Sequence, residues 1–178
     1  MKRTIMIILG MLAISTSALP QTPEIDKALS AAPKNAREGA TVVKWKDDFT
    51  YETLKKGTNR LVCYDRSGFP QQLPFSIECT SIANLDRVAQ NLKFEAMGDK
   101  KQAMLDAAEK DGTRVKPEYG SVWYHLMGAD KDHTRTHMTI AVPGATTQST
   151  GLPDNNKQGG VWIMNAGTTT AHIMTPGE

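Results

Sequence analysis

Two similar stretches in the C-terminal third of the chain constrain its fold more than any other feature. The first, GSVWYHLMG, covers residues 120–128, and the second, GGVWIMNAG, covers residues 159–167. Each is followed by a run that begins at a histidine, His137 or His172, and ends at Pro-Gly. The alternation of side chains and the bounding glycines predict a strand, a turn and a second strand in each repeat. Four strands of one antiparallel sheet are therefore expected from this third of the chain.

The preceding residues predict further strands and then helices. TVVKW (41–45) has the β-branched and aromatic character of a strand, and FTYETLKK (49–56) and RLVCYD (60–65) are predicted to form a hairpin. From residue 81 the apolar residues recur at helical spacing, and a second helix is predicted over 100–110. We therefore predict an α+β fold, with an antiparallel β-sheet of about six or seven strands and helices packed on one face.

The N-terminus has the pattern of an export signal. Lys2 and Arg3 precede an apolar run over residues 5–14, which gives way to small and polar residues. This pattern predicts a signal peptide over residues 1–18 and a single α+β domain over 19–178. The apolar run is too short for a permanent membrane span, so we expect an exported protein, periplasmic or extracellular, that has no membrane association after cleavage.

The charge balance narrows the class of partner. The signal segment carries two of the 21 basic residues and none of the 19 acidic ones, so the rest of the chain has 19 of each. No cluster of lysine and arginine marks a surface for nucleic acid or anionic lipid. We therefore expect no nucleic-acid partner, and the expected partner is an unknown small molecule or a protein.

The chain has two cysteines, Cys63 and Cys79. In an exported protein an isolated pair predicts a disulfide bond. A free reactive or metal-binding thiol pair is the alternative, although the spacing matches no common zinc motif. The segment between them, residues 65–78, contains two prolines and a glycine, and we expect it to form a loop without regular structure.

Several of these segments together resemble a known group of proteins. They are GTNRLVCYDRSG (57–68), the second cysteine ahead of a long helical stretch, and the closing GGVWIMNAGTTTAHIMTPG (159–177). The chain resembles a group of exported, functionally uncharacterised proteins of soil bacteria, and the closing motif is the most specific part of the resemblance. The resemblance implies export and a shared fold, and it brings no catalytic residues with it.

The histidines are the main candidates for chemistry, because the common nucleophile, zinc-protease, phosphate-loop and calcium motifs are missing. His137 and His172 occupy matching positions in the two repeats, and Met174 follows His172 on the same strand face. These three residues predict a site for copper, or for zinc. The alternative is that both imidazoles are hydrogen-bonded packing residues, and alternation along the first of these strands predicts a core face that includes Met138 and Val142.

His133 lies in a different context, because the surrounding GADKDHTRT has the composition of a solvated hairpin turn. With Asp130, Asp132 and His137 it could instead supply metal donors.

Trp123 and Trp162 begin the two repeats and allow two interpretations. Paired tryptophans on one sheet face could stack against a ligand, or both could be core positions. Two functions consequently stay open. One is an exported soluble binding or structural module of unknown ligand, stabilised by one disulfide. The other is a metal-dependent or hydrolytic enzyme with a site around His137 and His172.

Overall fold

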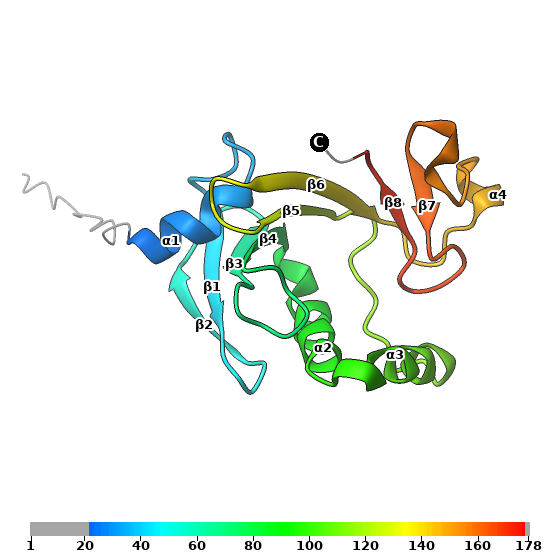
Figure 1. Ribbon diagram of the computed structural model, residues 1–178, viewed down its shortest axis with the longest axis horizontal. Coiled ribbons are helices and arrows are strands. Elements are labelled where there is room, and N and C mark those ends of the chain that lie inside the picture. Colours follow the sequence, from blue (N-terminus) through cyan, green and yellow to red (C-terminus); the bar gives the residue numbers. More distant parts are fainter. Residues whose placement is uncertain (1–21, 177–178) are drawn as a thin grey trace, which may run out of the picture.

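The computed structural model describes residues 22–176, and these form one eight-stranded sheet with helices on both faces (Figure 1). The predicted signal peptide, residues 1–18, lies outside the described residues. Within residues 22–176, no helix is both long enough and apolar enough to cross a bilayer. The strands are β1 (Thr41–Trp45), β2 (Tyr51–Lys55), β3 (Leu61–Asp65), β4 (Phe75–Ser81), β5 (Val122–Gly128), β6 (Thr134–Ala141), β7 (Trp162–Met164) and β8 (His172–Met174).

The helices lie between and before the strands. Thr22 caps the first helix through its side chain, which accepts a hydrogen bond from the backbone N–H of Ile25, as the Thr-Pro-Glu start predicts. The α-helices are α1 (Pro23–Ala28), α2 (Leu85–Glu95), α3 (Lys101–Lys110) and α4 (Thr147–Thr150). Short 3₁₀ turns are η1 (Leu29–Ala31), η2 (Ile82–Asn84), η3 (Gly98–Lys100) and η4 (Asn156–Gln158).

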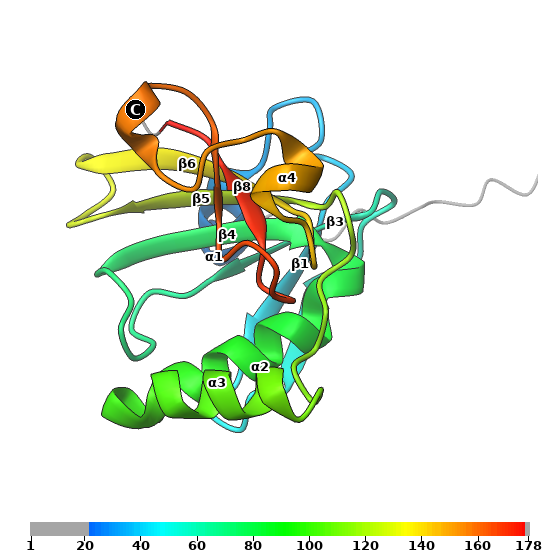
Figure 2. The same ribbon diagram turned by 90° about the vertical axis from the view of Figure 1, so that its right-hand side faces the viewer.

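The two faces of the sheet have separate cores. Leu85, Val88 and Leu92 of α2 pack with alternate residues of β1, β3 and β5, including Tyr64 and Trp123. The other face packs against α1 and η1 through a second cluster of apolar residues. Figure 2 shows α2 and α3 together beneath the first of these faces. The α+β class and the mainly antiparallel sheet are confirmed, with eight strands in the order β2-β1-β3-β4-β5-β6-β8-β7 and with α1 on the opposite face from α2.

The predicted hairpin between residues 49–56 and 60–65 is wrong. β1 lies between them, antiparallel to β2 and parallel to β3. The burial of the strands explains this arrangement, because four of the five residues of β1 are buried, whereas the first three residues of β2 are exposed. The apolar strand takes the interior position and the polar strand forms the edge of the sheet.

The segment predicted as a loop over residues 65–78 ends in a central strand. β4 begins at Phe75, and six of its seven residues are buried.

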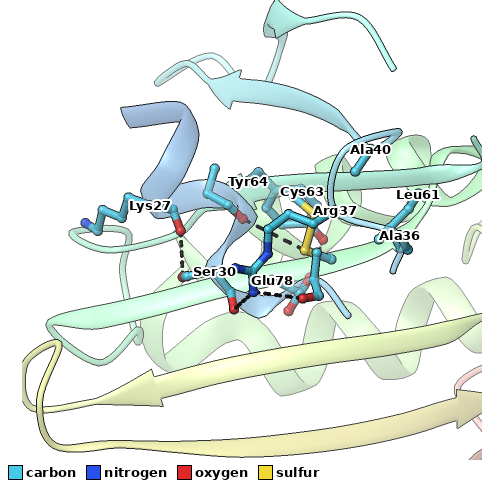
Figure 3. Close-up of a disulfide and its surroundings, with 12 residues drawn as sticks. Lys27, Ser30, Ala36, Arg37, Ala40, Leu61, Cys63, Tyr64 and Glu78 are labelled. Carbon is cyan, nitrogen blue, oxygen red and sulfur yellow. Dashed lines mark hydrogen bonds between the residues drawn. A yellow bond between two sulfur atoms is a disulfide. The ribbon is translucent and has the colours of Figure 1, made fainter. Parts of the chain in front are cut away.

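Cys63 of β3 and Cys79 of β4 are direct cross-strand partners, and the predicted disulfide between them is confirmed. The bond lies on the face covered by α1 and η1, beside Arg37 (Figure 3).

The C-terminal third contributes four strands, as the repeats predict. β5 pairs with β6 and β7 pairs with β8, while β6 and β8 join the two hairpins into one sheet. The prediction for the β6 face is only partly right, because Val142 is buried but Met138 is 36% exposed. The two tryptophans also differ, since Trp123 is buried and Trp162 is half-buried.

Candidate functional site

A row of polar side chains crosses the sheet on the face that α2 covers. Tyr64 of β3 pairs with Glu78 of β4, Glu78 pairs with His125 of β5, and His125 pairs with His137 of β6. Direct cross-strand partners lie on the same side of a sheet, so these four side chains form one line over four strands. The row forms because the strand register aligns residues that are far apart in the sequence.

Glu78 is the centre of this row and is 2% exposed. Its Oε1 accepts a hydrogen bond from the Tyr64 hydroxyl, and its Oε2 lies 2.7 Å from Nη1 of Arg66, which also pairs with Glu95. Burial alone would raise the pKa of Glu78, but Arg66, followed by the hydrogen bond from His125, outweighs burial and holds the pKa well below its ordinary value. Burial and the Glu78 charge raise the pKa of Tyr64, so its hydroxyl remains a donor.

Two imidazoles are fixed through Nδ1. Nδ1 of His125 lies 3.1 Å from Oε2 of Glu78, and Nδ1 of His172 lies 2.7 Å from the carbonyl oxygen of Thr170. Both partners are acceptors, so Nδ1 carries the hydrogen in each ring. Within residues 22–176, Nε2 of neither ring has a hydrogen-bond partner. The His137 ring stacks on His125 with centroids 5.9 Å apart.

Burial affects the protonation of two of these rings. Burial is the largest cause that lowers the pKa of His137, and the charge of His125 lowers it further. Burial also lowers the pKa of His172, against the opposing effect of the Thr170 carbonyl, with smaller contributions from His125 and Arg87. Burial thus favours the neutral form of both rings, and the charge of His172 is among the smaller causes that lower the pKa of His137.

These rings line a cavity of about 310 Å³ between the sheet, α2 and the loop that leads into β8. Arg87 of α2 also lines it and is 4% exposed. Its guanidinium donates to the carbonyl oxygen of Val115 and, over 2.9 Å, to Oγ1 of Thr170. No carboxylate of the described chain forms an ion pair with Arg87. Burial, and then the neighbouring charge of Arg114, lower the pKa of Arg87 to about 9, against the smaller opposing effect of the Glu109 charge.

The residues predicted as a metal site all line this cavity. His137, His172 and Met174 are among its walls, together with Met164. The register separates the two histidines, because His172 pairs with Ala141, four positions along β6 from His137. Across residues 22–176 no three His, Cys, Asp or Glu side chains are grouped as a metal site. A copper or zinc site at His137, His172 and Met174 stays a prediction.

The other predicted residues have separate places. Trp123 lines the cavity and belongs to the core, whereas Trp162 lies outside the cavity wall as the cross-strand partner of Met174. Asp130 accepts hydrogen bonds from the backbone N–H and Nδ1 of His133, and both side chains are mostly exposed. His133 therefore belongs to the solvated turn that its neighbours predict.

Three residues that matter most to the site are missed by the sequence pattern. Glu78 falls in the segment predicted as a loop, and the sequence around His125 does not distinguish it from the other histidines. Arg87 lies off the apolar stripe of its helix, a position typical of solvent exposure, yet it is buried. A charged residue between Ile77 and Cys79 was the available signal for Glu78, because an acid inside an apolar strand requires a buried partner.

Because comparisons with known proteins found no match to a protein-family model, a curated protein or a solved structure, we infer the function from the geometry of the cavity.

Proposed function

We propose that the protein is an exported binding module that holds a small anionic molecule in the cavity beside Arg87. The observation that carries this proposal is a buried guanidinium on the cavity wall that forms no ion pair with any carboxylate of residues 22–176, although the charge of Glu109 acts on it from outside the cavity wall. Export is supported by the signal-like N-terminus, by the disulfide and by the resemblance to exported soil-bacterial proteins.

The comparison with Arg66 shows why Arg87 is distinctive. Both arginines are buried, but Arg66 lies between Glu78 and Glu95 and forms ion pairs with both. Arg87 instead donates to two neutral oxygens, and the positive charge of Arg114 affects it more than the negative charge of Glu109 does. A buried charge is costly unless it is paired, so a ligand that brings a negative charge would stabilise this region.

The guanidinium retains donors for such a ligand. A guanidinium has five N–H groups in a planar fork that matches carboxylate and phosphate oxygens. Two of these groups bond to Val115 and Thr170. The free Nε2 atoms of His125 and His172 provide further polar contacts in the same cavity.

The walls of the cavity suggest the rest of the ligand. Trp123, Ala141 and Met174 are apolar, while the charged and imidazole groups occupy other parts of the wall. A volume of about 310 Å³ is at the lower end of the range for small-molecule sites. We propose a small organic acid or phosphate ester with an apolar body.

A thermal-shift comparison tests the proposal. Benzoate, phenyl phosphate and inorganic phosphate are compared with the neutral analogues benzamide and phenol at constant ionic strength. A ligand that binds only the folded state raises the melting temperature. We expect a rise with at least one of the anions and none with the neutral analogues. Equal shifts for benzoate and benzamide would show that the cavity does not select for charge.

A second candidate is acid–base catalysis at His125. A buried carboxylate holds Nδ1 of the ring, and Nε2 is free at a cavity, which is the arrangement of an oriented general base. In ester hydrolysis, Nε2 would take a proton from water as its oxygen attacks the carbonyl carbon, and the alkoxide would then leave with that proton. In this candidate His125 is the base, His137 stacks beside it, and His172 lines the same cavity.

Hydrolysis of p-nitrophenyl acetate and p-nitrophenyl phosphate tests this candidate. His125→Asn removes the base, and His133→Asn is the matched control in the exposed turn. General-base catalysis predicts a loss of about 100-fold or more in the first variant and none in the second. Equal rates in both variants and in the unsubstituted protein would remove the candidate for these substrates.

A further inference from the structure

Met164, His172 and Met174 are brought together at the β7–β8 end of the cavity. Met164 and His172 are direct cross-strand partners, and Met174 is two residues beyond His172 on the same strand. All three line the cavity. Direct partners such as Met164 and His172 have Cβ atoms about 4.5–5.5 Å apart, and Met174 is the diagonal neighbour of Met164, at about 7–8 Å, which is within reach of long side chains on the same sheet face.

The packing of this hairpin depends on its other face. Ile163 is 1% exposed and, with Ala171 and the half-buried Ile173, belongs to a small apolar cluster. Met164, in contrast, is 41% exposed. The core of the hairpin therefore does not require the thioether of Met164, and the face shared with His172 is available to bind a ligand.

His172 has the orientation of a metal-binding histidine. Its Nδ1 donates to the carbonyl oxygen of Thr170, which fixes the ring and leaves Nε2 as the free nitrogen. Ligating histidines commonly have such an outer partner on the second ring nitrogen. The bond is local and belongs to the loop into β8, so it orients the ring before any ion binds.

We propose that Nε2 of His172 and the sulfur atoms of Met164 and Met174 form a binding site for Cu(I), which Ag(I) can also occupy. Thioether sulfur is a soft ligand that selects Cu(I) over zinc, calcium or magnesium. Arg87 bonds to Thr170 close by, and its positive charge disfavours a divalent ion more than a monovalent one. The register replaces His137 with Met164 as the third donor of the predicted metal site.

Trp162 provides a spectroscopic reporter. It is the cross-strand partner of Met174 and is half-buried. An ion bound at Met174 therefore lies beside an indole, whose face attracts cations and whose fluorescence responds to them. Trp45 and Trp123 are buried, and Trp123 also lines the cavity, so Trp162→Phe is needed to identify the part of the signal that comes from Trp162.

The test is an anaerobic titration of the purified protein with Cu(I) in the presence of the chromogenic competitor bicinchoninate, repeated with Ag(I) by fluorescence. We expect one ion per chain and quenching of the Trp162 signal. Loss of an outer-shell partner lowers metal affinity by about 10- to 100-fold. Loss of a ligand should lower the Cu(I) affinity by more than this in each of three variants: Met164→Leu, Met174→Leu and His172→Gln. Leucine keeps the size of methionine, so the first two variants should fold normally.

Met138→Leu is the matched control, because Met138 is a partly exposed methionine on the opposite face of β6. It should bind Cu(I) as the unsubstituted protein does. If the protein removes no Cu(I) from the competitor, or if Met164→Leu and Met174→Leu bind as tightly as Met138→Leu, the site does not exist. The proposed anion site does not decide this result, since Arg87→Gln, which adds no sulfur donor to the cavity, should lose anion binding and retain Cu(I).

Discussion

Glu78 and His125 face each other across β4 and β5, and their side chains meet with Oε2 3.1 Å from Nδ1. The carboxylate is almost fully buried and also binds Tyr64 and Arg66. The Glu78 carboxylate therefore contacts both the core that packs against α2, through Tyr64, and the cavity, through His125. Whatever the cavity binds, the position of its first imidazole depends on this carboxylate.

Replacing Glu78 with Gln should destabilise the fold strongly. The substitution removes the negative charge next to Arg66, which is 8% exposed, and leaves Glu95 as its ion-pair partner. Breaking a buried ion pair costs about 3–5 kcal/mol, and we expect the lower end of this range because Glu95 remains. Urea denaturation measures the loss. Glu118→Gln, which breaks an exposed pair with Arg60, should cost less than about 1 kcal/mol.

The pKa of Glu78 also predicts a dependence of stability on pH. Its folded pKa lies well below the ordinary value of 4.5, so the unfolded chain binds the proton first as the pH falls. The contribution of Glu78 to the free energy of unfolding is complete above about pH 4.5 and decreases as the pH falls toward the folded pKa. Urea denaturation between pH 3 and pH 7 should show this decrease. If the free energy of unfolding of Glu78→Gln decreases equally steeply over this pH range, other groups cause the decrease.

The disulfide between Cys63 and Cys79 should contribute substantially to stability. It joins neighbouring strands across a separation of 16 residues. Loss of a native disulfide typically costs about 2–5 kcal/mol in small exported domains. Cys63→Ala with Cys79→Ala, compared with the unsubstituted protein by urea denaturation, measures the cost. Mass spectrometry of the non-reduced protein should find no free thiol, and two free thiols would contradict the bond.

The two tryptophans of the repeats should respond differently to a water-soluble quencher. Trp123 is 9% exposed and packs in the core, so Trp123→Ala should cost about 3–5 kcal/mol. Trp162 is half-buried, and we expect a smaller cost. Acrylamide should quench one component of the fluorescence readily, and Trp162→Phe should remove that component. Its persistence in Trp162→Phe would mean that Trp45 or Trp123 is accessible.

The sequence predicts local elements better than their arrangement. The caps and spacing near Thr22 and over residues 100–110 predict helices that are present, because these signals act within a few residues. The place of β1 between β2 and β3 depends on which strand has enough apolar surface for the interior, and sequence order favours the wrong pairing. Strand order is a property of the whole sheet.

The site shows the same limit. Alternation along β6 correctly separates His137 from Met138, but it assigns the core to the wrong side at Met138. α2 covers the His137 face, and the pattern of β6 alone holds no information about that helix. Glu78 and His125 are 47 positions apart and become partners only through register, so no local motif could predict them.

Isothermal titration calorimetry with the anion that gives the largest thermal shift tests anion binding at Arg87 most directly. The titration compares the unsubstituted protein, Arg87→Met and the exposed control Arg60→Met, after circular dichroism confirms that each is folded. Loss of one partner from a buried charge pair costs about 2–5 kcal/mol, so Arg87→Met should bind at least about 30-fold more weakly. Arg60→Met should bind unchanged. Equal affinity of all three proteins would contradict the proposal that Arg87 holds an anionic ligand.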